Sequence, residues 1–379
     1  MTVTPALIAQ TMKTIRQEYT ETVLPKWNPR EGCIYFEEAW IGHKQPYILP
    51  LVILKTHTCR WLQKSGGCAM CNYQFISAFE NRINDEDILS QARWALDRLS
   101  PIERYPYLHL TSSGSFLDPL EISDQVLTQT LSMLDSAGIE TFSTESRPEF
   151  LLNIHRLDLI KRSFSRQVTF GIGLESASDH VRNYCLNKGF DTDSFLEAIN
   201  TVKAYGMSFH SYILLGKPFL SPREDIEDVL RAIRLTLENG GIALVMVANL
   251  QPHTLIHWLW QRGKYELPKL WAPLKILELL EPDERERVWI KGLDKGVPTA
   301  DMYARNCENC TTVIHNALVG WNMTADFSLI EQVRDVCDCR QEWEGHLNDK
   351  IDTTVDQRLA QFYEQEWPSI AEQFTAARA

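Results

Sequence analysis

Residues 59–71 read CRWLQKSGGCAMC and bring three thiols, Cys59, Cys68 and Cys71, into one short segment. The segment directly follows an apolar run at residues 47–54, which predicts a buried β-strand. A loop at the end of such a strand is where an α/β barrel places its chemistry. The sequence therefore predicts a metal-binding loop at a strand end.

The number of thiols limits the kind of metal site. Three cysteines can hold three irons of a [4Fe-4S] cluster and leave the fourth iron open to a substrate or cofactor. A structural zinc ion takes four protein ligands, and this loop offers no fourth ligand beside the three thiols. Gly66 and Gly67 would let the backbone wrap closely around a cluster. We expect a four-iron cluster with one open iron, with a zinc site or scattered buried cysteines as alternatives.

A second group of cysteines lies near the C-terminus. Cys307, Cys310, Cys337 and Cys339 form two close pairs with the spacings Cys-x2-Cys and Cys-x-Cys. Four thiolates complete either a tetrahedral zinc site or an auxiliary iron–sulfur cluster. Both sites need the same four ligands, so the sequence predicts a second metal site and leaves the metal open.

Strand and helix patterns alternate along the middle of the chain. Such alternation predicts an α/β fold with parallel strands and right-handed crossovers. Six strands are fewer than the eight of a closed barrel, so we expect a partial (β/α)6 TIM-type barrel with a C-terminal Cys-containing extension. The predicted strands are residues 47–54, 107–111, 139–144, 168–174, 209–215 and 242–247.

This pattern divides the chain into three expected parts. Residues 1–45 form an N-terminal helix and arm, and the amphipathic spacing at residues 1–19 predicts a surface helix. Residues 46–250 form the barrel. Residues 251–379 form the extension with the second Cys site and a polar helix at residues 353–376. The Trp-rich stretch at residues 258–271 predicts either a stacking surface at the barrel mouth or a hydrophobic clasp between barrel and tail.

Composition limits the partners of the protein. The 379 residues are 44% hydrophobic, which is ordinary for a globular protein, and carry a formal net charge of -12. An acidic chain is repelled by phosphate backbones, so charge does not indicate nucleic-acid binding, although a local basic patch remains compatible with it. The sequence shows no signal peptide and no apolar run long enough to span a bilayer. We therefore expect a cytoplasmic protein without a membrane partner.

Polar residues follow successive predicted strands. Small hydroxyls around a glycine expose backbone groups that can hold an amino or carboxylate group, and Glu and Arg can hold an amine, a ribose or a carboxylate. The alternatives are ligand-free turns, a solvated ion pair and glycines that serve packing. The coincidence at neighbouring strand ends favours a ligand site. Its candidates are Ser113, Gly114 and Ser115 after the second strand, Glu145 and Arg147 after the third, and Glu175 after the fourth.

These segments, in this order, resemble the radical S-adenosylmethionine (SAM) superfamily, and in particular the archaeosine-synthesis radical SAM family on the branch of the Elongator catalytic subunit. The resemblance spans about residues 30–346, and no single motif carries it. The matching segments include GCAMC at 67–71, SGSFLD at 113–118, ESRPE at 145–149, GLE at 173–175, NKG at 187–189, WQRGKY at 260–265, and the Cys pairs at 307–310 and 337–339.

The resemblance implies a cofactor set. Cys59, Cys68 and Cys71 would ligate a [4Fe-4S] cluster whose open iron binds SAM, and reduction would cleave SAM into methionine and a 5′-deoxyadenosyl radical. An electron donor such as flavodoxin or ferredoxin is implied as a partner. The SAM amino group would meet Ser113, Gly114 and Ser115, the ribose or carboxylate side would meet Glu145 and Arg147, and the ribose would meet Glu175.

The resemblance also implies a substrate, a 7-deazaguanine-type nucleoside in tRNA. Two alternatives remain at this point. The first is a radical SAM enzyme that acts on a small metabolite derived from an amino acid or a deazapurine, by hydrogen abstraction or group transfer. The acidic net charge of the chain favours this alternative. The second is a metal or redox protein without catalysis, which the open coordination site of a three-thiol loop disfavours.

Overall fold

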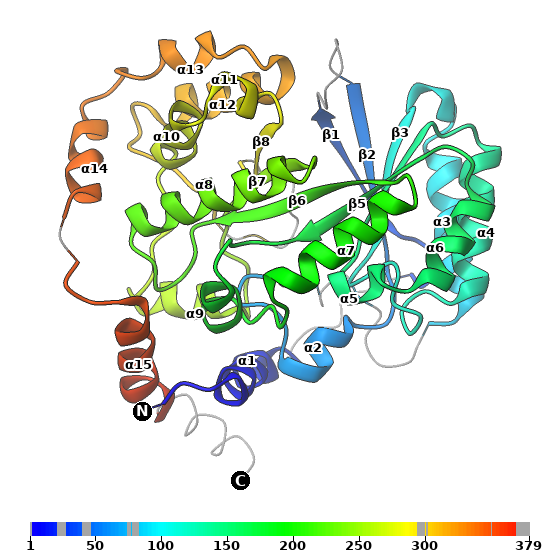
Figure 1. Ribbon diagram of the computed structural model, residues 1–379, viewed down its shortest axis with the longest axis horizontal. Coiled ribbons are helices and arrows are strands. Elements are labelled where there is room, and N and C mark those ends of the chain that lie inside the picture. The colour runs from blue at the N-terminus through cyan, green and yellow to red at the C-terminus, as the bar shows by residue number, and fades with distance from the viewer. Residues whose placement is uncertain are drawn as a thin grey trace.

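The structure is a computed structural model, and it describes residues 2–20, 28–39, 47–73, 77, 83–293, 300, 302–349 and 351–368. Its centre is one eight-stranded sheet whose strands lie side by side in chain order (Figure 1). β1 pairs with β2 in antiparallel orientation, and every later pair is parallel. The strands are β1 (Cys33–Ala39), β2 (Tyr47–Leu54), β3 (Tyr107–Ser112), β4 (Thr141–Glu145), β5 (Gln167–Gly173), β6 (Ser208–Leu215), β7 (Ile242–Val247) and β8 (Val288–Lys291).

The six predicted strands are β2 to β7, so the expected partial barrel is confirmed. The sheet has one further strand at each edge. β1 is the predicted arm, and residues 40–45 of that arm lie outside the described residues. β8 lies within residues 251–379 and extends the parallel sheet past residue 250, where the sequence predicts the barrel to end. Its four residues are too few to show a strand period in the sequence.

Helices that alternate with the strands cover one face of the sheet (Figure 1). Local sequence explains where they begin: α8, for example, has Ser221 as its N-cap, Pro222 in the first turn and Glu224 in a capping box. The helices that follow β2 to β6 include α3 (Asp85–Arg98), α4 (Asp124–Ser136), α6 (Ile154–Ser163), α7 (Thr192–Ala204) and α8 (Pro222–Glu238). Shorter segments are η2 (Ile102–Arg104), α5 (Pro148–Leu151) and the π-helix η3 (Val181–Cys185).

Four helices from distant parts of the chain gather at one end of the sheet (Figure 1). They are α1 (Pro5–Thr20), α2 (Arg60–Ser65), α9 (Leu255–Gln261) and α15 (Val355–Gln365). Because α2 follows β2 and α9 follows β7, this is the end at which the parallel strands finish. The predicted amphipathic helix at the N-terminus is α1: its apolar side, with Ile8 and Met12 fully buried, packs in a core shared with α9 and α15, and Lys13 on another side is exposed.

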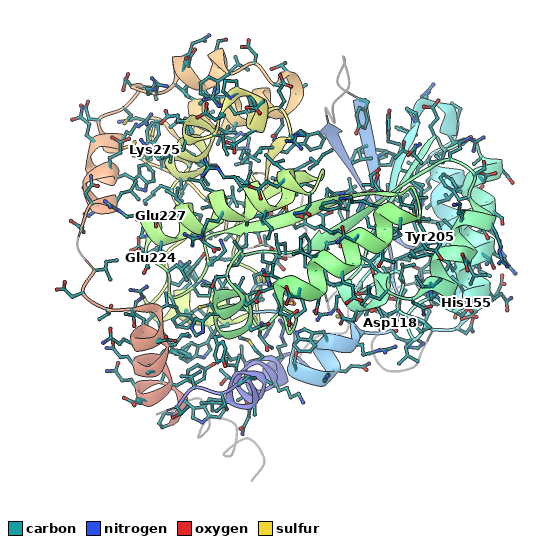
Figure 2. All side chains as sticks on the ribbon, viewed as in Figure 1. Asp118, His155, Tyr205, Glu224, Glu227 and Lys275 are labelled. Carbon is teal, nitrogen blue, oxygen red and sulfur yellow. The ribbon has the colours of Figure 1, made fainter. Side chains whose placement is uncertain are left out.

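The C-terminal segment continues through short helices and returns to the barrel. It contains α10 (Trp271–Leu279), α11 (Pro282–Arg285), α12 (Thr311–Thr324), α13 (Ser328–Gln332), α14 (Cys339–Leu347) and then α15. The predicted helix at 353–376 is thus α15 up to Gln365, and residues 369–376 lie outside the described residues. Arg358 of α15 donates to Glu224 at 2.6 Å, at the start of α8, where Figure 2 labels Glu224.

Two tryptophans of residues 258–271 pack inside the protein. Trp258 meets Phe362 of α15 edge-on with ring centroids 5.9 Å apart, and Trp271 is only 1% exposed. The structure therefore favours the hydrophobic clasp over a stacking surface at these two residues. Within the described residues, no helix combines the length and apolar character needed to cross a membrane.

Candidate functional site

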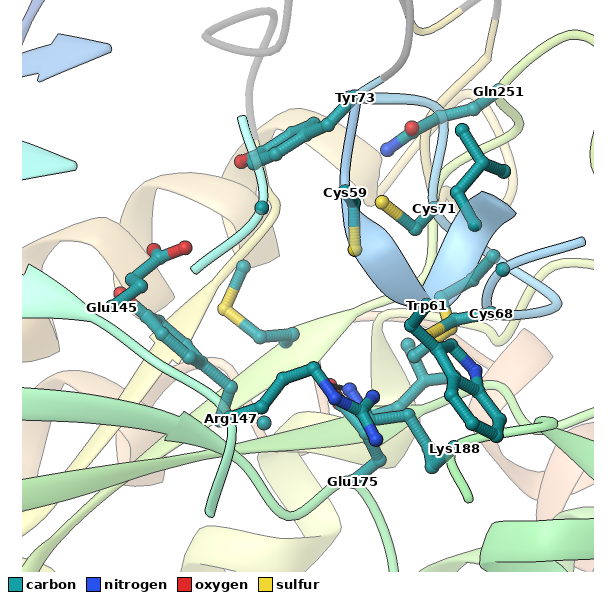
Figure 3. Close-up of a pocket in the computed structure, with 18 of the residues that line it drawn as sticks. Cys59, Trp61, Cys68, Cys71, Tyr73, Glu145, Arg147, Glu175, Lys188 and Gln251 are labelled. Carbon is teal, nitrogen blue, oxygen red and sulfur yellow. Dashed lines mark hydrogen bonds and ion pairs between the residues drawn. The ribbon is translucent and has the colours of Figure 1, made fainter. Parts of the chain in front are cut away.

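The Cys59–Cys71 loop and the ends of the central strands enclose a cavity of about 250 Å³ (Figure 3). Of the residues predicted to hold the first cluster and SAM, all but Ser115 line this cavity. Ser115 is fully buried behind the wall, where its hydroxyl accepts from the backbone N–H of Arg147. The lining includes Cys59, Cys68, Cys71, Ser113, Gly114, Glu145, Arg147, Glu175 and Lys188.

Arg16 fixes the cysteine loop from the N-terminal helix. Its guanidinium donates to the carbonyl oxygens of Cys68, at 2.8 Å, and Cys71, at 2.7 Å. The side chain is buried, so its two charge-assisted bonds are not weakened by water. The loop backbone around two of the three thiols is therefore held by a residue more than fifty positions earlier in the chain.

The segment after η3 fixes the loop from the opposite side. The amide of Asn187 donates to the carbonyls of Gly67, at 2.8 Å, and Ser65, at 3.0 Å. In return the indole N–H of Trp61 donates to the Asn187 carbonyl at 2.6 Å. Asn187 has φ of 53°, a left-handed conformation that asparagine tolerates better than most residues. The loop is thus shaped by contacts from two sides.

The thiols of this loop belong to partly buried residues and lie in a partly cationic setting. Burial, with the charge of Glu121, raises the pKa of Cys59 to about 12. Burial also raises the pKa of Cys71, although the charges of Arg16 and Lys188 oppose the rise. Binding of metal to such thiols would release their protons, and the two cations would compensate the resulting negative charge. The donor set, three thiols with two cations beside them, fits an iron–sulfur cluster.

Two predicted SAM contacts are engaged in ion pairs. Arg147 contacts Glu149 at 2.6 Å, and its guanidinium lies 4.7 Å from the centre of the Trp61 ring. Glu175 contacts Lys188 at 3.1 Å. Figure 3 shows Arg147, Glu175, Lys188 and Trp61 together on one side of the pocket, near Cys68. This cluster contains both cationic and anionic side chains, which can pair with the carboxylate and the ammonium group of an amino-acid moiety.

Glu145 lies apart from this cluster, on the other side of the pocket in Figure 3. Its carboxylate is 3.4 Å from Nε2 of His109. The structure thus brings Glu145 into the same cavity as the thiols but pairs it with a side chain from the inner face of the sheet. Its contact with SAM stays a prediction.

Glu121 supports the turn that contains Ser113 and Gly114. It is fully enclosed and accepts from the Ser115 backbone N–H at 2.9 Å and from the Ser112 hydroxyl at 3.0 Å. Burial raises its pKa to about 8. A Cβ on Gly114 would lie 2.1 Å from the Glu121 carboxylate, so the turn requires glycine at this position.

The second Cys group forms a compact set. The Sγ atom of Cys307 lies 3.4 Å from that of Cys310 and 3.4 Å from that of Cys337, and Cys310 and Cys339 are 3.5 Å apart. All four Sγ atoms lie within 4.8 Å of one another, as no other group of metal-ligating side chains does among the described residues. Hydrogen bonds from Cys310 and Cys337 lower the pKa of Cys307 to about 7. This group could hold a metal ion.

Comparison with known proteins adds to this geometry. The chain is 28% identical over 302 residues to archaeosine synthase subunit beta of Methanosarcina acetivorans, covering 78% of this chain and 84% of that protein. The chain is similar in sequence to proteins of the archaeosine-synthesis family. The protein of the same name from Thermococcus kodakarensis is 27% identical over 77% of this chain and 90% of its own length. No family model matches this chain. Archaeal Elp3 of Methanocaldococcus infernus overlays with a TM-score of 0.46, 12% identity, and coverage of 77% of this chain and 63% of that chain.

Several residues of the site were not predicted from the sequence. Arg16 is the clearest case, although a signal existed. Ile8, Met12 and Ile15 mark the apolar stripe of α1, and a position four residues after Met12 falls on that same stripe. A charged residue there predicts a buried polar contact. His109, by contrast, is recognised only once β3 and β4 are aligned, because only then does it lie beside Glu145.

Proposed function

We propose that this enzyme reductively cleaves SAM at a [4Fe-4S] cluster to modify a 7-deazaguanine-type nucleoside in tRNA. The observation that carries the proposal is its sequence relationship, over more than three quarters of the chain, to proteins named archaeosine synthase subunit beta. The cavity that joins the three thiols to polar strand ends supports it.

In this proposal Cys59, Cys68 and Cys71 hold the cluster. When bound and reduced, the cluster supplies the electron that cleaves SAM. Arg147 and Lys188 would orient the SAM carboxylate, and Glu175 and the carbonyls of the Ser113-Gly114 turn would accept from its ammonium or ribose. Arg16 would hold the loop in shape. A flavodoxin or ferredoxin would deliver the electron.

For the second Cys group we propose a single zinc ion. Sulfur atoms around one tetrahedral ion with bonds of about 2.3 Å lie about 3.8 Å apart. The separations of 3.4–3.5 Å are close to that value. A four-iron cluster places each thiolate on a different iron and so spreads the sulfur atoms more widely than one ion does. The ion would join the start of α12 to the start of α14.

Local charge near the cysteine loop supports tRNA as the substrate in spite of the net charge of -12. α1 and α2 pack side by side at this end of the sheet. Each of them exposes one lysine, Lys13 on α1 and Lys64 on α2. A basic surface beside the cavity would contact phosphate groups.

The alternative is a small metabolite as substrate, derived from an amino acid or a deazapurine, and the acidic net charge of the chain favours it. The two proposals differ in the use of this basic surface. Only an RNA substrate needs phosphate contacts there, so charge reversal at Lys13 and Lys64 separates them.

The test compares the double variant Lys13→Glu/Lys64→Glu with the matched control Lys161→Glu/Arg162→Glu on α6, where both residues are exposed. For a tRNA substrate, the first variant should bind tRNA more weakly and reduce the slope of log K against log salt by about two. The control should bind like the parent. Equal tRNA binding by both variants would refute the use of this surface, and SAM-dependent turnover of a free metabolite but not of tRNA would establish the alternative.

A further inference from the structure

A second cavity, of about 490 Å³, lies along the inner face of the sheet. It adjoins the first cavity, because Tyr73, Glu145, Tyr212 and Met246 line both. Its volume is within the range of ligand-binding pockets, about 300–1,000 Å³. The two cavities together connect the cysteine loop with the interior of the half-barrel.

Aromatic side chains form much of the wall of this inner cavity. Tyr47, Tyr107, Tyr212 and Trp289 belong to four different strands and all line it. Tyr47 and Tyr107 lie with ring centroids 4.5 Å apart. Flat faces of this kind stack on planar heteroaromatic groups, a contact worth about 1–3 kcal/mol per base in other proteins. The wall therefore suits a flat ligand.

A carboxylate is fixed at the junction of the two cavities. His109 is within 3.0 Å of the Ser143 hydroxyl through Nδ1 and within 3.4 Å of Glu145 through Nε2. Burial alone would raise the pKa of Glu145, but the hydrogen bond and charge of His109, with a hydrogen bond from Tyr212, lower it below its usual value. Glu145 therefore stays ionised, and a quarter of its side chain remains exposed toward the cavity.

His210 belongs to the lining of the same cavity, but its ring nitrogen is turned into the wall. The residue is 8% exposed, and its Nε2 atom is covered and has no hydrogen-bond partner among the described residues. Burial and then the charge of His109 lower its pKa to about 3, so the ring is neutral. The ring packs against Gly171, because a Cβ there would lie 2.6 Å from Nε2.

We propose that the inner cavity binds the base of the substrate, with Glu145 accepting the adjacent ring N–H and amino N–H of a guanine-type edge. A carboxylate matches two parallel N–H donors in the same way that it matches a guanidinium. The base would then extend from the inner face of the sheet toward the cysteine loop. This inference deepens the proposed function and rests on it.

The first test varies the ligand and leaves the protein unchanged. Cluster-loaded enzyme with SAM is titrated anaerobically, by calorimetry, with 7-deazaguanosine, 7-deazainosine, which lacks the 2-amino group, and 7-deazaadenosine, which lacks the N–H pair. We expect 7-deazaguanosine to bind about tenfold to a hundredfold more tightly than the other two, because each loses a hydrogen bond to a charged group. Equal affinity for all three would overturn the proposal.

The second test places the discrimination on Glu145. Glu145→Gln should bind 7-deazaguanosine at least tenfold more weakly and should discriminate less against 7-deazainosine. The matched control is Glu284→Gln, since Glu284 is a partly exposed carboxylate paired with Arg234 at 3.0 Å outside the cavity. The control should behave like the parent. Melting temperature and cluster absorbance show that each variant is folded and loaded.

The results separate this inference from the proposed function. If Glu145→Gln weakens SAM binding and leaves nucleoside binding unchanged, Glu145 belongs to the SAM site and the inference is refuted. If the parent modifies tRNA and Glu145→Gln does so with the same KM and preference, the function stands and the inference fails. If the parent discriminates among the nucleosides but does not modify tRNA, the inference is upheld and tRNA as the substrate is contradicted.

Discussion

Replacement of Arg16 by Met should loosen the cysteine loop. The substitution keeps most of the volume and the helix propensity of α1, but it removes the donors to the carbonyls of Cys68, at 2.8 Å, and Cys71, at 2.7 Å. A hydrogen bond to a charged group is worth about 1.5–3 kcal/mol, so two of them contribute about 3 kcal/mol or more to holding the loop. If the loss of these hydrogen bonds destabilises the cluster-bound loop by that free energy, the variant should release the cluster about a hundredfold faster than the parent.

The assay is the rate of iron transfer from the reconstituted enzyme to a coloured chelator under anaerobic conditions. Lys13→Met is the matched control, because Lys13 is an exposed cation on the same helix. The control should release iron at the parental rate, and Arg16→Lys, which keeps the charge but not the fork of donors, should fall between the two. Iron release from Arg16→Met at the parental rate would refute the reasoning, since the loop would then hold its shape without α1.

Three further outcomes follow from the structure. Glu121 has a pKa of about 8 in the folded chain, whereas an ordinary glutamate loses its proton near pH 4.5. The free energy of unfolding should therefore decline as the pH rises from about 4.5 to about 8, and denaturant titrations of Glu121→Gln should show a weaker decline. Cys339→Ser should release the second-site metal and lower the melting temperature by several degrees, whereas Cys33→Ser should retain one zinc per chain by elemental analysis; unchanged zinc in Cys339→Ser would contradict the second site. Arg147→Ala should weaken SAM binding about tenfold to a hundredfold at unchanged cluster absorbance; binding as tight as in the parent would make Arg147 only the ion-pair partner of Glu149.

The barrel was predictable because short strand segments, several of them apolar runs, alternate with helices of clear periodicity. Residues 47–54 and 242–247 are assigned in the sequence with the same bounds that β2 and β7 have in the structure. β8 escaped because its four residues, VWIK, carry no period of their own and are strand only by pairing with β7. Tertiary context decides such short segments.

The site was predictable in part for a related reason. Strand ends converge in any parallel sheet, so polar residues placed there by sequence arrive in one pocket, as Ser113, Glu145 and Glu175 do. Contacts between elements that are distant in the sequence leave no such pattern in the sequence. The pairing of Glu145 with His109 depends on the alignment of β3 with β4, and the placement of Arg16 depends on the docking of α1.

The most direct test of the central claim is product analysis after anaerobic incubation of the reconstituted enzyme with SAM and a strong reductant. The parent should form 5′-deoxyadenosine and methionine. Separate Cys59→Ala, Cys68→Ala and Cys71→Ala variants, folded by circular dichroism, should form neither product. Formation of 5′-deoxyadenosine by any of the three variants, or formation of none by a parent that carries its full complement of cluster iron, would contradict the assignment of these three cysteines to a SAM-cleaving cluster.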